Sequence, residues 1–180
     1  MNKLQGTIIS VLNLLDRPLY RTEIVKFIYM IDEMYFRHFG KTITGINYKW
    51  DNFGPNSVDD GIINEAEKLV NEGIIHMSSE PNQYGGTSYL YKLEKLYDES
   101  LSSLSEGEKY VIKDIAYHFK HCSLSELIQA SKQTASFKGV EQYHDIELKQ
   151  SKKYQEIVES LKADEGFVHG VEAVRKEMAV

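Results

Sequence analysis

Residues 22–39 constrain the fold more than any other segment, because they combine a helical repeat with very little polar surface. The residues of one face recur every three or four positions, as expected for a buried helix: they are Ile24, Phe27, Ile28, Ile31, Met34, Tyr35 and His38. Further apolar residues widen this face: they are Tyr29, Met30, Phe36 and Phe39. The segment is therefore predicted to be the central helix of a domain. Thr22 is its predicted N-cap and Gly40 its predicted C-terminal stop.

Three polar residues of this helix, Lys26, Tyr29 and Asp32, follow at intervals of three and lie on one side of it. One interpretation is a solvated pair of charges beside a buried tyrosine. The other is that the charges hold the following loop in place or face a partner. The sequence leaves both open.

An aromatic strand and a turn follow the central helix. Within residues 42–51, Ile46, Tyr48 and Trp50 alternate with polar residues, which predicts a half-buried strand. Residues 53–56, Phe-Gly-Pro-Asn, predict a turn.

The aromatic residues Tyr48, Trp50 and Phe53 have two interpretations. At least two of them are expected to pack against the central helix. Alternatively they form a protein-binding surface, because Tyr and Trp are enriched where interfaces concentrate their binding energy.

The rest of the chain predicts further helices and one hairpin. A first helix covers residues 4–15, and Leu19–Arg21 is a short connector. A third helix begins after Ser57 and ends at Gly73, two strands lie at 74–77 and 88–93, and capping boxes at Ser105 and Ser123 open two more helices. A helix followed by a hairpin with a Gly-rich tip resembles a winged helix, as a fold-level analogy.

The predicted fold class is mainly α with a small antiparallel β element (α+β). A compact helical domain, residues 1–139, carries the winged-helix-like hairpin. A charged helical C-terminal extension, residues 140–180, follows it, with amphipathic helices expected around Ile146 to Leu161 and after Asp164. This extension either docks on its own domain or is an arm that folds on a partner.

Composition and charge argue against several functional classes. The net charge of −6 argues against free nucleic acid as the main partner, because Lys and Arg supply nonspecific DNA binding. Cys122 is the single cysteine, so no internal disulfide can form. The sequence shows no membrane span and no signal peptide, and a cytoplasmic protein is expected.

Catalytic and metal-binding signals are weak. His118, His121 and Cys122 have a spacing that could place metal ligands at one helix end, but no second Cys or His pair supports them, and His144 and His169 are distant. The sequence has no nucleotide-binding loop and no nucleophile motif. We expect no catalytic residue, no metal, no cofactor and no enzymatic activity.

The chain resembles the Panacea, or SocA-like, antitoxin domain family over residues 5–139. The residues that carry the resemblance are Lys26-Phe27-Ile28-Tyr29-Met30-Ile31-Asp32, Gly40-Lys41-Thr42-Ile43-Thr44-Gly45, Tyr48 and Phe53-Gly54-Pro55. The helices that open at Ser105 and Ser123 resemble the second half of the family. The chain has Phe53 where many relatives have Tyr, so one hydroxyl is absent from the turn.

The resemblance implies a non-catalytic antitoxin of a type II toxin–antitoxin system, many of which belong to prophages or other mobile elements. Such an antitoxin neutralises a cognate protein toxin by direct binding. The candidate partner-binding residues are Lys26, Tyr29, Asp32, Tyr48, Trp50, Phe53, Gly54 and Pro55. Alternatives are a winged-helix-like DNA-binding regulator that represses its own operon, and a protease adaptor. A homo-oligomer is possible, DNA is possible but not favoured, and no membrane partner is expected.

Overall fold

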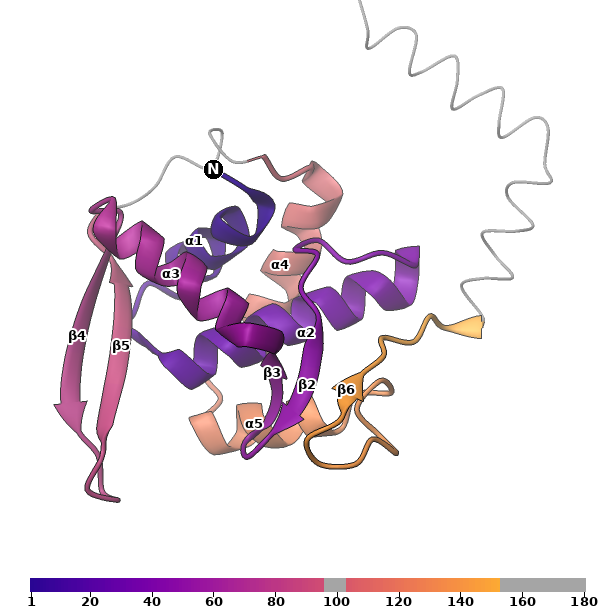
Figure 1. Ribbon diagram of the computed structural model, residues 1–180. Helices are drawn as coiled ribbons and strands as arrows, with labels where there is room; N and C mark the ends of the chain where they lie inside the picture. Colours follow the sequence, from indigo (N-terminus) through magenta and orange to yellow (C-terminus); the bar gives the residue numbers. More distant parts are fainter. Residues whose placement is uncertain (96–102, 153–180) are drawn as a thin grey trace, which may run out of the picture.

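The computed structural model describes residues 1–95 and 103–152 (Figure 1). These residues form helices α1 (Lys3–Leu15), α2 (Arg21–Phe39), α3 (Gly61–Asn71), α4 (Glu106–His118) and α5 (Leu124–Lys132), with a 3-10 turn at Val58–Asp60. The strands are β1 (Leu19–Tyr20), β2 (Tyr48–Asp51), β3 (Gly54–Ser57), β4 (Ile75–Pro81), β5 (Thr87–Leu93) and β6 (Asp145–Ile146). The predicted α+β class is confirmed.

Helix α2 runs through the middle of the molecule, and the other helices lie around it (Figure 1). Phe27, Ile28 and Ile31 are fully inaccessible to solvent. Each such side chain contributes roughly 1.5–3 kcal/mol by leaving water. The prediction of a central helix is confirmed, and Gly40 closes it at φ +67°, a left-handed conformation that glycine adopts without strain.

The start of α2 differs from the prediction. The helix begins at Arg21, with Tyr20 rather than Thr22 as its N-cap. The Glu23 carboxylate accepts a hydrogen bond from the Tyr20 backbone N–H at 2.8 Å and pairs with Arg17 at 2.8 Å. Leu19 and Tyr20, predicted as a connector, form β1 because they pair with β5.

The first sheet has the strand order β1-β5-β4. Strands β4 and β5 form the predicted hairpin, which extends further than the sequence indicated, with Ile75 opposite Leu93 and Pro81 opposite Thr87. The hairpin follows α3 and projects from the body of the molecule (Figure 1). The winged-helix comparison remains an analogy.

The second sheet has the order β3-β2-β6 and corrects two predictions. Residues 54–56, predicted within a turn, form β3 together with Ser57, and the chain reverses at Asn52 and Phe53 instead. Ser57 was predicted to cap the third helix, but α3 begins at Gly61 with Asp60 as its N-cap. Pro55 is tolerated because β3 is an edge strand, where a missing N–H breaks no ladder. Ile146, predicted in a helix, lies in β6 opposite Tyr48; the remainder of that predicted helix, and the one after Asp164, fall mostly in residues 153–180, outside the described residues.

The division at residue 139 stays a prediction. Within the described part of the extension, Ile146 is buried, and the Lys149 backbone N–H donates to Ser136 Oγ at 2.9 Å. Residues 140–152 thus contact the domain that precedes them.

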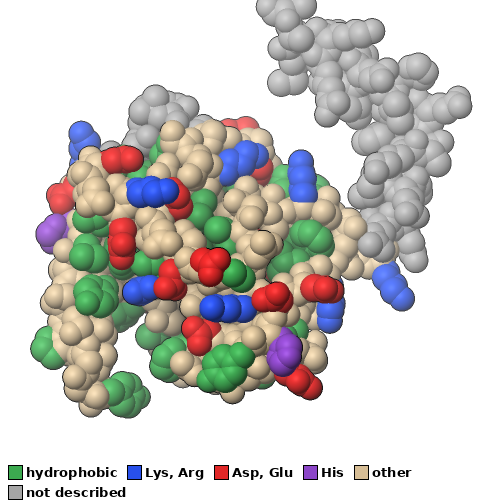
Figure 2. Space-filling model, viewed as in Figure 1, with side chains coloured by type: hydrophobic (Ala, Val, Ile, Leu, Met, Phe, Trp, Pro, Cys, Tyr) green, Lys and Arg blue, Asp and Glu red, His purple; other side chains and the backbone are tan. Residues whose placement is uncertain are grey.

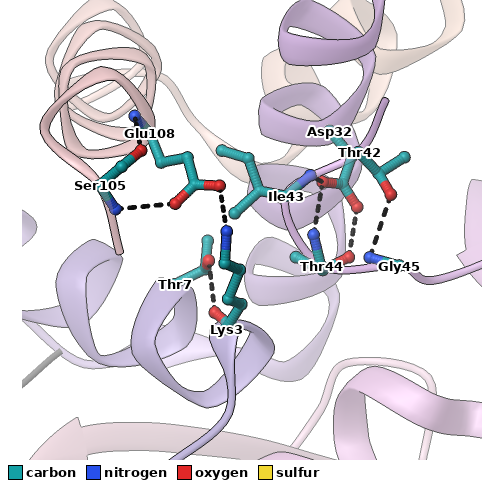
Figure 3. Close-up of polar contacts among 9 residues, drawn as sticks. All are labelled: Lys3, Thr7, Asp32, Thr42, Ile43, Thr44, Gly45, Ser105 and Glu108. Carbon is teal, nitrogen blue, oxygen red and sulfur yellow. Dashed lines mark hydrogen bonds and ion pairs between the residues drawn. The ribbon is translucent and has the colours of Figure 1, made fainter. Parts of the chain in front are cut away.

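Both predicted capping boxes are confirmed. At α4, the Ser105 N–H donates to Glu108 at 2.8 Å and Ser105 Oγ accepts from the Glu108 N–H at 3.4 Å. Glu108 also pairs with Lys3 of α1 (Figure 3). At α5, Ser123 and Glu126 make the equivalent exchange. The same carboxylate that caps α4 therefore joins it to α1.

Trp50 tests the packing of the second sheet. Its ring lies 4.5 Å from the Phe137 ring, centroid to centroid, and it is half-buried. We expect Trp50→Ala to lower the free energy of unfolding by about 2 kcal/mol, below the ~3–5 kcal/mol of a fully buried aromatic residue. Urea denaturation measures this. A variant as stable as the original chain would contradict the packing described.

Candidate functional site

Asp32 lies near the middle of α2 and is completely buried. Its Oδ1 accepts from the backbone N–H groups of Ile43 at 2.8 Å and Thr44 at 3.1 Å (Figure 3). Its Oδ2 accepts from the Thr44 hydroxyl and from the Tyr48 hydroxyl, the latter at 2.7 Å. One carboxylate therefore fixes the loop that enters β2 and the first residue of that strand.

The environment of Asp32 acts on its pKa in two directions. Burial raises the pKa, because a low-dielectric surrounding disfavours the charged form. The hydrogen bonds from Thr44, Tyr48 and Ile43 lower it. These donors are what allow a carboxylate to occupy the interior, since every buried polar group needs a partner.

Tyr29, one turn before Asp32, connects α2 to the chain after α5. Its hydroxyl shares a hydrogen bond with Thr134 Oγ1 at 2.7 Å. Its ring meets the Tyr48 ring edge to face at a centroid distance of 5.1 Å, a favourable aromatic geometry. Burial raises the pKa of both tyrosines, so both keep their hydroxyl protons at neutral pH.

Lys26, a further turn back, holds the other strand of the hairpin. Its Nζ donates to the Pro55 carbonyl oxygen at 2.5 Å, and only 2% of the residue is exposed. Burial and, to a lesser extent, the charge of Lys132 lower the pKa of Lys26 to about 8, while the charge of Asp51 opposes the shift. The three polar residues of α2 thus fix three different places: the entry loop, the chain after α5, and β3.

The eight candidate residues converge on the β2–β3 hairpin and its supports. Buried among them are Lys26, Tyr29, Asp32, Tyr48, Gly54 and Pro55. Trp50 is half-buried, and Phe53 at the tip of the hairpin is 64% exposed. The buried side chains position the hairpin, and Phe53 is the one among the eight that is largely exposed to solvent. Their role in partner binding stays a prediction.

The alternative interpretations can now be separated. The interpretation of Lys26 and Asp32 as a solvated pair of charges is wrong, because both residues are buried and each has its own hydrogen-bond partners. The interpretation that they hold the following loop agrees with the contacts of Asp32. Tyr48 and Trp50 pack in the domain, as expected for at least two of the three aromatic residues.

Several supporting residues escaped the sequence analysis. Thr134 carries the Tyr29 contact, and Ser136 Oγ donates to the buried Glu33 at 3.3 Å. Lys132 lies against Gly54, where an added Cβ would come within 3.1 Å of its side chain. These residues lie between 78 and 105 positions from their partners, so no local pattern reveals them.

The described residues contain no group of three or more His, Cys, Asp or Glu side chains placed to hold a metal ion. His118 ends α4 with its ring against Phe119 at a centroid distance of 4.7 Å. Among the helices that the structure describes, none has the length and apolarity needed to cross a membrane.

The comparisons with known proteins bear on this arrangement. A family model described as the antitoxin SocA-like, Panacea domain matches residues 24–138. The chain belongs to this family. The Panacea match begins in α2 and ends after α5, so it contains the candidate residues, whereas α1 and β6 lie outside it. The comparisons with curated proteins and with solved structures return no significant match. Membership supports an antitoxin role.

Removing the Asp32 carboxylate tests its part in the site. Asp32→Ala leaves two backbone N–H groups and two hydroxyls without their acceptor, and we expect a loss of about 3–5 kcal/mol at ~1–3 kcal/mol per unsatisfied buried group, offset by water entry. Asp32→Asn keeps one acceptor oxygen and should lose less than half as much. Urea denaturation measures both variants. Equal stability of the alanine and asparagine variants would contradict the proposed hydrogen bonding.

Proposed function

We propose that the protein is a non-catalytic antitoxin that neutralises a cognate protein toxin in the cytoplasm by direct contact through the β2–β3 hairpin. Membership of the Panacea family supports the antitoxin role. The choice of surface rests on one observation: Lys26 and Asp32 of α2 fix β3 and the loop that enters β2, and the hairpin that these strands form carries an exposed Phe53.

A preorganised hairpin suits a binding role. Association costs less when the contact surface is already ordered, because side chains and loops lose little freedom on binding. Exposed aromatic side chains at a rigid position are frequent energetic centres of interfaces. Lys26, Tyr29 and Asp32 each make a hydrogen bond that holds the fold together, so no catalytic role is needed to explain why they are present.

DNA binding is less well supported. The exposed charged residues of α3 and of the turns that flank it are mainly acidic: Asp59, Asp60, Glu67 and Glu72, with Lys68 among them. Figure 2 shows acidic and basic side chains interspersed over the face that it draws, with no continuous area of Lys and Arg. A helix presenting this charge would repel phosphates.

Co-expression with the product of the adjacent gene tests the proposal. We expect that product to arrest growth alone and to be tolerated together with this protein. Phe53→Ala should abolish neutralisation without loss of thermal stability, because the side chain is largely exposed. Tyr84→Ala is the matched control, since Tyr84 is 87% exposed at the tip of the other hairpin.

A neighbour that is harmless alone, or that stays toxic beside the unaltered protein, would refute the antitoxin function. If neutralisation survives Phe53→Ala and fails with Tyr84→Ala, the toxin contacts the β4–β5 hairpin instead of the β2–β3 hairpin.

A further inference from the structure

A cavity of about 230 Å³ opens beside the β2–β3 hairpin, between that hairpin and the N-terminal half of α2. Its lining includes Lys26, Asp51, Gly54 and the exposed Phe53. Arg21 and Asp60 also line it and pair with each other at 3.5 Å. The cavity therefore joins a buried cation to an exposed aromatic ring.

The Lys26 ammonium is incompletely satisfied within the described residues. It has three N–H donors, and within residues 1–95 and 103–152 its one hydrogen bond is to the Pro55 carbonyl oxygen. No carboxylate of the described residues lies within ion-pair distance of it. The negative charge of Asp51 acts on Lys26, but the Asp51 carboxylate accepts from the Asn52 N–H at 2.7 Å and from Asn56 Nδ2 at 3.2 Å.

A second lysine adds positive charge behind the cavity. The Lys132 side chain lies against Gly54, and its charge acts on Lys26. The charged residues that line the cavity are balanced, with Arg21 and Lys26 against Asp51 and Asp60. Lys132 lies outside this lining, and its charge adds one positive charge to the surroundings of Lys26. One added carboxylate would balance this added charge and supply the acceptor that Lys26 lacks.

We propose that this cavity receives the side-chain carboxylate of an Asp or Glu residue of the protein partner, which pairs with Lys26 while adjoining apolar surface packs on Phe53. The inference rests on the proposed function for the existence of such a partner. It adds the chemistry of the contact: an acidic side chain beside an apolar one. A desolvated ion pair of this kind contributes more to the selection of a partner than an exposed one.

Acetylated, amidated dipeptides test the cavity without the toxin. Phe-Asp and Phe-Glu are the acidic probes, and Phe-Asn and Phe-Gln are their neutral counterparts. In titrations followed by NMR, we expect saturable amide shifts in residues 21–26 and 51–56 with the acidic probes, and binding about tenfold weaker or absent with the neutral ones.

Three variants test the charge balance: two should weaken the binding of the acidic probes and one should strengthen it. Misfolding could explain a loss of binding but not a gain. Lys26→Gln keeps a donor for Pro55 but removes the charge, and should abolish the preference for the acidic probes. Lys132→Met should weaken their binding several-fold. Asp51→Asn removes the competing anion and should strengthen it.

The pKa of Lys26 gives a further readout, because the pKa of a lysine with a purely structural role would not change when a probe is added. A bound carboxylate favours the charged ammonium, so the acidic probes should raise the Lys26 pKa from about 8. The other charges that face Lys26 are Lys132 on α5 and Asp51 on β2, with the Arg21–Asp60 pair at the rim. Measurement of the Lys26 side-chain carbon signal against pH detects the shift.

Equal binding of acidic and neutral probes, shifts away from these residues, or no saturable shift at all would overturn the inference. Stronger binding of a neutral dipeptide with a free C-terminus than of the amidated acidic dipeptides would also overturn it, because the cavity would then select a chain end. These outcomes are independent of co-expression, which alone decides the antitoxin function.

Discussion

The arrangement of the second sheet depends on the buried carboxylate of Asp32. This carboxylate accepts hydrogen bonds from two backbone N–H groups and two hydroxyls at one point of the central helix. Backbone groups in a connecting loop normally bond to water, which makes loops mobile. Here Ile43 and Thr44 bond to a side chain of the core instead, so the loop and the start of β2 take their position from α2.

Lys26 and Tyr29 extend this principle along the same side of the helix. Side chains three positions apart lie on neighbouring turns, and each of the three reaches a different segment. Lys26 contacts β3, Tyr29 contacts Thr134, and Asp32 contacts the entry loop. Removing one partner of a buried polar contact is costly, whereas replacing both partners by apolar groups of similar shape can be nearly neutral for stability. Their effect is therefore best understood as fixing where the hairpin lies.

The sequence predicted the elements whose signals are local. The capping boxes at Ser105 and Ser123 and the apolar face of α2 were correct, because each depends on residues within one or two turns. Thr22 was wrong as the N-cap because β1, which fixes Tyr20, forms only by pairing with the distant β5. Pro55 was read as part of a turn because nothing in its neighbourhood reveals that it lies on an edge strand.

The sequence brought the candidate residues together as one set but did not reveal which of them are buried, and their role in partner binding stays a prediction. Lys26, Tyr29 and Asp32 were identified as one set by their spacing and by the family resemblance. Spacing does not reveal that two charged residues are buried, because their partners come from Pro55, Thr44 and Tyr48 only after the chain has folded. The cavity beside Lys26 depends likewise on contacts between segments far apart in sequence.

Amide hydrogen exchange of Ile43 and Thr44 tests the central claim most directly. If Asp32 holds the entry loop, these two amides exchange only when the domain opens, with a free energy close to that of the amides in the middle of α2. In Asp32→Asn their protection should decrease while that of α2 is largely retained. Exchange in the unaltered protein as fast as in the exposed loop around Tyr84 would contradict the account.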